Sequence, residues 1–310
     1  MIPAVHPAVR RYAPAMPHRL HANRGATFET LFEAAAPDGP IRGGDLPADL
    51  RRYGDHLAVP LRPDRPTVLV NFVESIDGVV TFDPEHGSGA EVSGFNEPDR
   101  FVMGLLRAVA DVIVVGAGTV RAAPNHVWTP GVVNRPFAGA YAAWREALGL
   151  APEPTTYVIT ANGDVPTDQP AFSARGVPVV VVSTARGVRR LGPALPALVR
   201  LVAAPDATHV SAGSILELAR NEGARVVLCE GGPHLIGTFV DERLIDALFL
   251  TVAPQLIGRQ GNDGRFGLVE GVALGIDDAP WARLQSVRRS VDHLFLRYAF
   301  EGAALSGTAA

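Results

Sequence analysis

The sequence predicts an α/β fold in which a mixed, mostly parallel sheet lies between two layers of helices. Short apolar runs such as Val68–Val73 and Val179–Val182 have the length and composition of buried strands. Stretches with helical spacing, such as Phe101–Ala110, separate these runs, and this alternation favours a three-layer sandwich with a largely parallel sheet. The last two expected strands, about Arg283–Arg288 and His293–Phe300, are joined by a short turn, so an antiparallel C-terminal hairpin should complete the sheet.

The first 62 residues differ from the rest because prolines recur throughout them and break any long element. One short helix is expected there, over Thr27–Ala36, with Thr27 as its cap. We interpret residues 1–62 as an arm that wraps the body of the protein or a partner subunit, with a disordered tail as the alternative. Residues 63–310 would form the main domain.

Strands and helices follow in turn from residue 67 onward. Further strands are expected at 112–115, 157–160, 226–229 and 248–252, and further helices at 141–148, 214–221 and 235–241. The connection 122–154 is long and punctuated by Gly and Pro, and long connections of this kind are often functional.

Composition excludes several classes of protein. A chain of 310 residues with 47% hydrophobic content can bury a sizeable core, and its net charge of −4 gives no sign of a nucleic-acid-binding surface. No run approaches the roughly 18 apolar residues of a membrane helix, and the N-terminus lacks the features of a signal peptide, so we expect a cytoplasmic protein with no membrane partner. The single cysteine, Cys229, excludes a disulfide framework and a Cys-rich zinc site, and we expect no metal. The chain has no lysine, which excludes Schiff-base and phosphate-loop chemistry.

Gly116-Ala117-Gly118-Thr119 follows an expected strand and leads into a short helix, with Thr119 as its expected cap. Glycine lets the backbone approach a phosphate, and the free N–H groups of a helix start attract anions. Gly-x-Gly alone is weak evidence for a dinucleotide-binding site, because the third glycine of the classical dinucleotide fingerprint is missing. A tight turn between strand and helix is the alternative.

A second strand runs into Glu230-Gly231-Gly232-Pro233, where Pro233 suits the first turn of a helix. Glu230 would project from the carboxyl end of the strand, where open α/β sheets bind ligands. A carboxylate there could hold a polar substrate or help in proton transfer, whereas a helix cap or a surface acid is the alternative. A third segment, Ser75–Gly78, is by itself an ordinary turn.

Together these segments resemble the reductase domain of the bifunctional deaminase-reductases of riboflavin synthesis, a family with a dihydrofolate-reductase-like fold. The resemblance covers about Pro66–Phe300. The family's Ser-Leu-Asp-Gly, Thr-Val and Glu-x-Gly-Pro segments appear here as Ser75–Gly78, Thr119–Val120 and Glu230–Pro233, and a matching Leu-Leu-Arg-Ala stands at Leu105–Ala108.

The resemblance implies an NADPH-dependent reductase of a small-molecule substrate, and a homodimer. The implied substrate-binding residues are Arg107, Glu230 and Asn71, with Glu230 also the catalytic candidate. The backbone of Val73 would line the nicotinamide pocket, and Thr160 would lie near the adenosine end. The remaining candidate cofactor-binding residues are Gly116, Thr119, Gly231, Gly232, Pro233, His234, Leu235, Ile236, Gly237 and Thr238. Arg186 is a candidate clamp for a 2′-phosphate.

Two departures from the family concern the substrate. The family often has a lysine where this chain has Asn71, and it usually has an aspartate shortly after the Thr-Val pair, where Arg121–Pro124 contains none. The leading hypothesis is therefore reduction of a phosphoribosylamino-pyrimidine, while reduction of dihydrofolate or a related pterin stays open. A third hypothesis is a non-catalytic homologue that binds the nucleotide without turnover. The zinc-dependent deaminase half is excluded, because its signature needs more than one cysteine.

Overall fold

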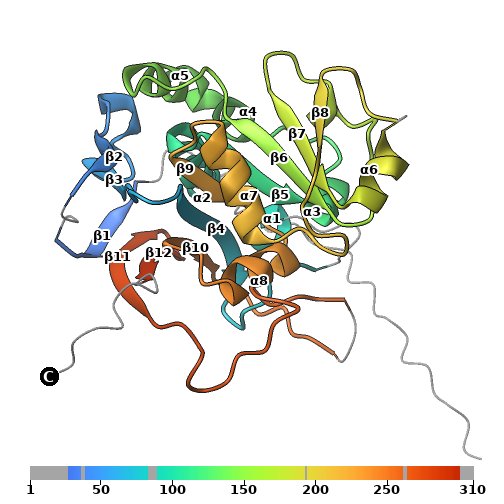
Figure 1. Cartoon of the computed structure of the whole chain (residues 1–310). Helices are drawn as coiled ribbons and strands as arrows, with labels where there is room; N and C mark the ends of the chain where they lie inside the picture. The colour runs from blue at the N-terminus through green and yellow to red at the C-terminus, as the bar shows by residue number, and fades with distance from the viewer. Residues whose placement is uncertain (1–26, 36–38, 83–88, 193, 261–263, 301–310) are drawn as a thin grey trace, which may run out of the picture.

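The computed structural model describes residues 27–35, 39–82, 89–192, 194–260 and 264–300, and its centre is a ten-stranded sheet (Figure 1). The strand order is β1-β11-β12-β10-β4-β9-β5-β6-β7-β8, and a separate two-stranded sheet pairs β2 with β3. The strands are β1 (Glu29–Glu33), β2 (Ile41–Asp45), β3 (His56–Pro60), β4 (Thr67–Ser75), β5 (Val112–Gly116), β6 (Thr155–Thr160), β7 (Val179–Ser183), β8 (Val199–Ala203), β9 (Val226–Cys229), β10 (Ala247–Ala253), β11 (Ala282–Ser290) and β12 (His293–Phe300).

The direction of the strands confirms the predicted mixed sheet. From β10 through β4, β9, β5, β6 and β7 to β8, each strand is parallel to its neighbour. On the other side of β10, the strands β12, β11 and β1 are each antiparallel to the one before. The antiparallel C-terminal hairpin is thus β11–β12. Because the parallel strands share one direction, their carboxyl ends meet at one edge of the sheet.

Helices cover both faces of the sheet, which gives the expected three layers. Leu69 of β4 and Leu228 of β9 pack with α2 on one face, whereas Val70 and Val227 face α7 and α8, which lie in front of the sheet in Figure 1. The helices are α1 (Gly89–Val92), α2 (Glu97–Val109), α3 (Ala117–Ala122), α4 (Pro130–Val133), α5 (Ala138–Ala147), α6 (Ala185–Leu191), α7 (Ala212–Asn221) and α8 (Pro233–Asp241), with short 3₁₀ turns η2 (Ala48–Leu50), η3 (Arg135–Phe137) and η4 (Pro170–Phe172).

The predicted helix over Thr27–Ala36 is wrong, because the described part of this segment forms strand β1. All five side chains of β1 are exposed, so no apolar stripe is available to hold a helix on the core. Its backbone instead pairs with β11, in a register that joins Glu29 to Arg289. Residues 1–26 lie outside the described residues.

The described residues from 39 to 62 pack on the main domain. Leu50 of η2 and Val59 of β3 have no exposed surface, and both belong to the hydrophobic cluster that contains α2. Despite the prolines, these residues form the regular elements β2, η2 and β3. Contact of the arm with a partner subunit stays a prediction.

Candidate functional site

The two glycine segments singled out in the sequence lie against each other at the carboxyl edge of the sheet. β5 and β9 are neighbours, and the backbone N–H of Glu230 donates to the carbonyl of Val114 at 3.0 Å. One step further, the N–H of Gly116 donates to the carbonyl of Gly231 at 2.7 Å. The chain therefore brings the ends of β5 and β9 to one place, as the site hypothesis requires.

Gly231 is a position where only glycine fits. Its φ is +96°, in the region that L side chains rarely adopt, and a Cβ built there would lie 2.5 Å from the ring of Phe72. At Gly232 a Cβ would lie 3.4 Å from the hydroxyl of Thr119, so this turn also joins the start of α8 to α3. The lack of a side chain along Gly231–Gly232 thus lets Phe72 and Thr119 lie close to this backbone.

The helices that follow these glycines begin without a capping side chain. Gly232 is the N-cap of α8, with Pro233 in the first turn as predicted, and Gly116 is the N-cap of α3. By contrast, α2, α4, α6 and α7 each have a side chain that accepts a hydrogen bond from their first turn. The first-turn N–H groups of α8 therefore face the sheet edge with no side-chain acceptor, which favours an anion. The predicted cap role of Thr119 is wrong, because this residue lies inside α3.

Glu230 and Arg107 form a buried ion pair at this edge. The guanidinium donates from Nε to Oε1 at 2.9 Å and from an Nη atom to Oε2 at 2.6 Å. The pair joins α2 to the end of β9, and the two side chains are 1% and 4% exposed. A bidentate pair of this kind fixes the carboxylate in orientation. Sequence reasoning named both residues but not their contact.

Arg107 has further partners within the protein. It donates to the carbonyl of Thr129 at 3.1 Å and contacts Nε2 of His126 at 2.9 Å. Because a guanidinium only donates, Nε2 of His126 accepts and the neutral ring carries its proton on Nδ1. Burial, with the nearby Arg107 charge, lowers the pKa of His126 to about 3.

The burial of Arg107 bears on its expected contact with a substrate, which stays a prediction. The residue has no exposed surface, and its donors are directed at Glu230, Thr129 and His126. In this structure its guanidinium holds the carboxylate of Glu230 in place. Arg107 is also not a solvent-exposed arginine of its helix, because it has no exposed surface.

Asn71 lies on β4 beside the Glu230 position. The register pairs Val70 with Cys229, so the next residues along the two parallel strands, Asn71 and Glu230, are neighbours on the face that α2 covers. Asn71 is 8% exposed, and no described residue forms a hydrogen bond with its amide. Its amide is thus available to a ligand.

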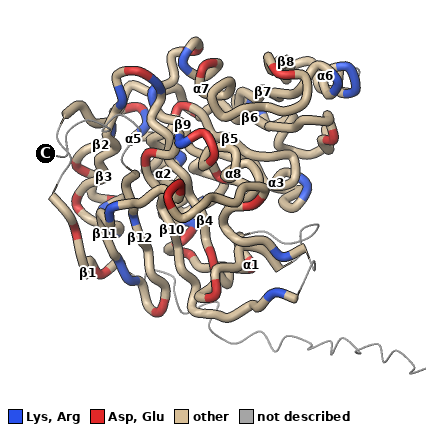
Figure 2. The backbone as a smooth tube through the Cα atoms, turned by 60° about the horizontal axis from the view of Figure 1, so that its bottom comes forward, with Lys and Arg blue, Asp and Glu red and all other residues tan. Residues whose placement is uncertain are grey.

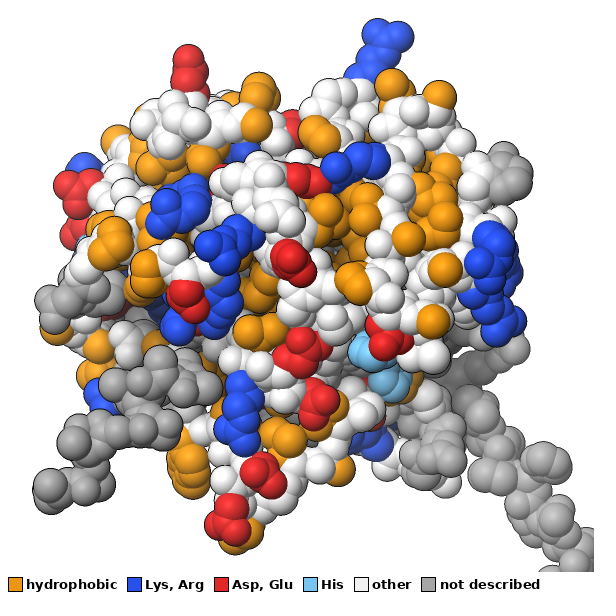
Figure 3. All heavy atoms as spheres, viewed as in Figure 1, with side chains coloured by type: hydrophobic (Ala, Val, Ile, Leu, Met, Phe, Trp, Pro, Cys, Tyr) orange, Lys and Arg blue, Asp and Glu red, His pale blue; other side chains and the backbone are white. Residues whose placement is uncertain are grey.

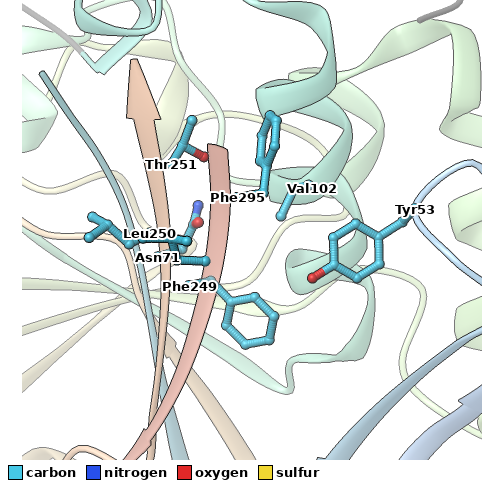
Figure 4. A pocket seen from close by; sticks show the side chains of 8 residues that line it. Tyr53, Asn71, Val102, Phe249, Leu250, Thr251 and Phe295 are labelled. Atoms are coloured by element: carbon cyan, nitrogen blue, oxygen red, sulfur yellow. The ribbon is translucent and has the colours of Figure 1, made fainter. Parts of the chain in front are cut away.

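Figure 4 shows the small hollow that Asn71 lines. Its empty volume, including space open to solvent, is about 180 Å³, but the side chains around it leave no room for a water-sized molecule in this structure. The hollow therefore does not hold a substrate as it stands. The residues that line it are Tyr53, Asn71, Val102, Phe249, Leu250, Thr251, Phe295 and Leu296.

Asp99 is a buried carboxyl group next to this hollow that sequence reasoning did not single out. It lies in the first turn of α2, where its N–H donates to the side chain of Asn96 at 2.9 Å. Burial raises the pKa of Asp99 to about 6, although hydrogen bonds from Thr251 and Ser93 oppose the shift. Acidic residues are common in the first turn of helices, so the sequence alone indicates only a helix start.

The residues of the segment Gly232–Thr238 differ in whether they are exposed at the helix start or buried in the core. Gly232, Pro233 and His234 have surface at the helix start, but Leu235 and Ile236 are buried in the core. A Cβ at Gly237 would lie 2.1 Å from the carbonyl oxygen of Glu270, and the Thr238 hydroxyl donates within its own helix. The side chains of Leu235 and Ile236 therefore pack the helix on the core, and a contact of the Leu235–Thr238 backbone with a cofactor stays a prediction.

Val73 and Thr160 lie at two other strand ends of the same edge. Val73 of β4 is 7% exposed and pairs with Thr251 of β10. The hydroxyl of Thr160, at the end of β6, contacts Asn162 and accepts from the N–H of Gly163, each at 3.2 Å. Thr160 thus shapes the turn after β6.

In the described part of the chain, no helix is long and apolar enough to cross a membrane. No group of three or more His, Cys, Asp or Glu side chains there is arranged to hold a metal ion.

Comparison with known proteins identifies relatives of this arrangement. The model of the family described as "RibD C-terminal domain" matches residues 66–286. The chain is 26% identical over 194 residues to 2,5-diamino-6-ribosylamino-4(3H)-pyrimidinone 5′-phosphate reductase of Archaeoglobus fulgidus, covering 63% of this chain and 83% of that protein. It is 25% identical over 195 residues to the protein of the same name from Aquifex aeolicus, covering 63% and 80%.

Solved structures with the same fold include a pyrimidine reductase-like protein and a deaminase/reductase. A pyrimidine reductase-like protein from Corynebacterium diphtheriae superposes with a TM-score of 0.59 at 18% identity, over 76% of this chain and 92% of that one. The deaminase/reductase of Thermotoga maritima gives a TM-score of 0.55 at 17% identity, over 76% of this chain and 57% of that longer one. These likenesses confirm the predicted α/β fold, which the chain shares with both structures.

Proposed function

The chain belongs to the RibD C-terminal domain family, and from this premise we propose that it reduces a phosphoribosylamino-pyrimidine of riboflavin biosynthesis to the ribitylamino form. Two curated relatives are reductases of such a compound, and an oxidoreductase activity follows from that kinship. The proposed cofactor is NADPH, which supplies a hydride to C1 of the open-chain sugar imine when it is bound.

The backbone at the edge of β5 and β9 fits the pyrophosphate of a nicotinamide dinucleotide. No side chain fits at Gly231, and the first-turn N–H groups of α8 lack a side-chain acceptor. These N–H groups and the hydroxyl of Thr119 beside Gly232 would bind the pyrophosphate oxygens. Thr160 would lie toward the adenosine, and the backbone of Val73 toward the nicotinamide.

The side chains beside this edge would hold the substrate. Glu230 would accept hydrogen bonds from a sugar hydroxyl or a pyrimidine N–H, and the bidentate contact with Arg107 keeps its carboxylate in one orientation. The amide of Asn71 can both donate and accept, so it suits the edge of a heterocycle. The protein's contribution would be mainly positioning.

The observation that carries the proposal is the contact between the two glycine segments beside Glu230, with Gly116 donating to Gly231 at 2.7 Å. The test is a spectrophotometric assay of NADPH and NADH oxidation with the phosphoribosylamino-pyrimidine, both before and after deamination of its ring. Turnover with neither form would refute the proposal.

Reduction of dihydrofolate or a related pterin is the second candidate. Asn71 replaces the family's lysine, and Arg107 is engaged with Glu230 and so offers no free guanidinium to a substrate phosphate. Dihydrofolate and pterins belong in the same assay, and a higher kcat/KM for one of them would favour this candidate. Tight NADPH binding without turnover on every compound would indicate a non-catalytic homologue.

We also propose that the protein acts in the cytoplasm as a homodimer. Apolar side chains are exposed on adjoining strands of one sheet edge, with Leu31 and Phe32 of β1 50% and 43% exposed and Leu284 of β11 37% exposed. Pairing of such a face across a two-fold axis would remove it from water.

A further inference from the structure

His126 lies beside the Arg107–Glu230 pair, in the loop that follows α3. The same Nη atom of Arg107 contacts Oε2 of Glu230 at 2.6 Å and Nε2 of His126 at 2.9 Å, so the carboxylate and the imidazole are neighbours. We propose that Nδ1–H of His126 donates a hydrogen bond to a ring carbonyl of the substrate, while Glu230 accepts one from the adjoining ring N–H. The two side chains would thus recognise a lactam edge together. This inference rests on the proposed function, because it concerns the substrate side of the same site.

Three segments that are distant in the sequence meet at this place. In Figures 1 and 2, α2, which carries Arg107, lies next to β9, which ends just before Glu230. β5 is the other neighbour, and α3 begins directly after it, so α3 leads from the same sheet edge into the loop that carries His126. The contact with Arg107 brings the imidazole of that loop back to the end of β9.

The Arg107 contact fixes which nitrogen of His126 carries the proton. A guanidinium has donors only, so Nε2 accepts and the proton lies on Nδ1. Burial, with the nearby Arg107 charge, holds the pKa of His126 at about 3, so the ring stays neutral near pH 7. A ring with this pKa is poorly matched to proton transfer at that pH, whereas its Nδ1–H serves as a hydrogen-bond donor.

The imidazole ring is held in place, but its Nδ1–H has no partner. The ring of Trp128, itself buried, packs edge-on against it with 5.0 Å between the centroids. The backbone N–H of His126 donates to the carbonyl of Ala123 at 3.0 Å, which ties the loop to the end of α3. No described residue forms a hydrogen bond with Nδ1, and the residue is only partly buried. An oriented, unpaired donor of this kind can bind an acceptor at little cost in ordering.

A donor next to an acceptor matches a lactam better than it matches a phosphate. The Glu230 carboxylate only accepts, and the Nδ1–H of His126 only donates. A lactam presents N–H and C=O on neighbouring atoms of one planar ring, which is the complementary pair. A phosphate has acceptors only and would meet the Glu230 carboxylate as a like charge. On the face that Figure 3 shows, acidic side chains lie among the basic ones, so this face has no field of one sign that would draw a polyanion.

Amide substitutions at position 126 test the two ring nitrogens separately. The amide of an asparagine lies where Nδ1 lies in histidine, whereas the longer glutamine places its amide at the position of Nε2. His126→Gln can therefore still accept from Arg107 but has no donor at the Nδ1 position. His126→Asn keeps a donor at that position and loses the contact with Arg107. His56→Gln removes an exposed imidazole on β3 and is the matched control.

The measurements are steady-state kinetics with NADPH and the phosphoribosylamino-pyrimidine, and urea unfolding of the full chain. His126→Gln should raise KM about 3- to 10-fold with kcat and the unfolding midpoint unchanged, because a neutral hydrogen bond is lost equally from the bound substrate and the transition state. His126→Asn should keep KM within about twofold of wild type and lower the unfolding midpoint, because a buried donor of Arg107 loses its acceptor. His56→Gln should change neither quantity. With sulfur, a weak acceptor, in place of the lactam oxygen of the substrate, the difference in KM between His126→Gln and wild type should shrink.

An unchanged KM in His126→Gln, or a KM for His126→Asn as high as that of His126→Gln, would overturn the role of Nδ1–H and leave His126 only a support for Arg107. Turnover by wild type would still leave the proposed function standing in that case. Failure of wild type to bind or reduce any of the pyrimidines and pterins would overturn the proposed function, and this inference with it.

Discussion

Removing the charge of Glu230 should affect stability and catalysis by separable amounts. In Glu230→Gln, the amide oxygen can still accept one hydrogen bond from Arg107, but the guanidinium loses its counter-charge, and because the pair is 1% and 4% exposed, solvent cannot replace the lost carboxylate. Breaking a buried pair from one side costs about 3–5 kcal/mol of unfolding free energy, or roughly 6–20 °C in Tm. The lost charge-assisted bonds to substrate, about 1.5–3 kcal/mol, should lower kcat/KM roughly 10- to 150-fold.

A double-mutant cycle separates the two effects. Arg107→Met should destabilise the protein to a similar extent, because it leaves the Glu230 carboxylate buried without its partner. The double variant, with Glu230→Gln and Arg107→Met, has no unpaired charge at this place and should be more stable than either single variant. Its kcat/KM should stay low, since the substrate-binding carboxylate is still missing.

The measurements are urea unfolding for the four proteins and steady-state kinetics with NADPH and the preferred substrate. Destabilisation of the double variant equal to the sum of the two single losses would mean that Arg107 and Glu230 do not act as a pair. Unchanged kcat/KM in Glu230→Gln, with a lowered Tm, would leave Glu230 a structural role only.

Three further predictions concern other parts of the site and the assembly. Gly232→Val should weaken NADPH binding in a fluorescence titration while the fold persists, because its side chain would enter the space beside Thr119; unchanged affinity would remove this turn from the cofactor site. Asp99 has its folded pKa raised from 3.8 to about 6, so wild type loses stability as pH rises. Between pH 5 and 8 the loss should be about 1.4 kcal/mol. Asp99→Asn should abolish that part of the dependence in urea titrations, and identical pH profiles for the two proteins would contradict it. Light scattering at micromolar concentration should give a dimeric mass, and a monomeric mass would refute the homodimer.

The sequence was sufficient for the parallel strands because their apolar runs are nearly continuous. Val179–Val182 and Val226–Cys229 are buried on both faces of the sheet, which is what a run without alternation indicates. β8 was not predicted, since its residues are only half-buried or exposed and Arg200 interrupts the run. β1 was mistaken for a helix because its strand pairing, and not its composition, determines its conformation.

The site was predictable residue by residue but not as a set of contacts. The strand-glycine-helix pattern is local, so Gly116 and Gly232 could be found from the sequence. The partner of Glu230 is Arg107, 123 positions away, and no local pattern reports such a contact. Asp99 was not identified from the sequence for a similar reason, since its burial against Thr251 depends on how α2 packs on β10.

Pairing of β1 with β11 has a consequence for how the protein is made. Glu29 meets Arg289, 260 positions later in the chain. At about 5–20 residues per second, a ribosome needs roughly 13–50 s to add that stretch. During that time β1, which contains Leu31 and Phe32, has no strand partner, while the core strands between β1 and β11 in the sequence can already associate. The edge of the sheet is therefore completed only in the last part of synthesis, when β11 becomes available to pair with β1.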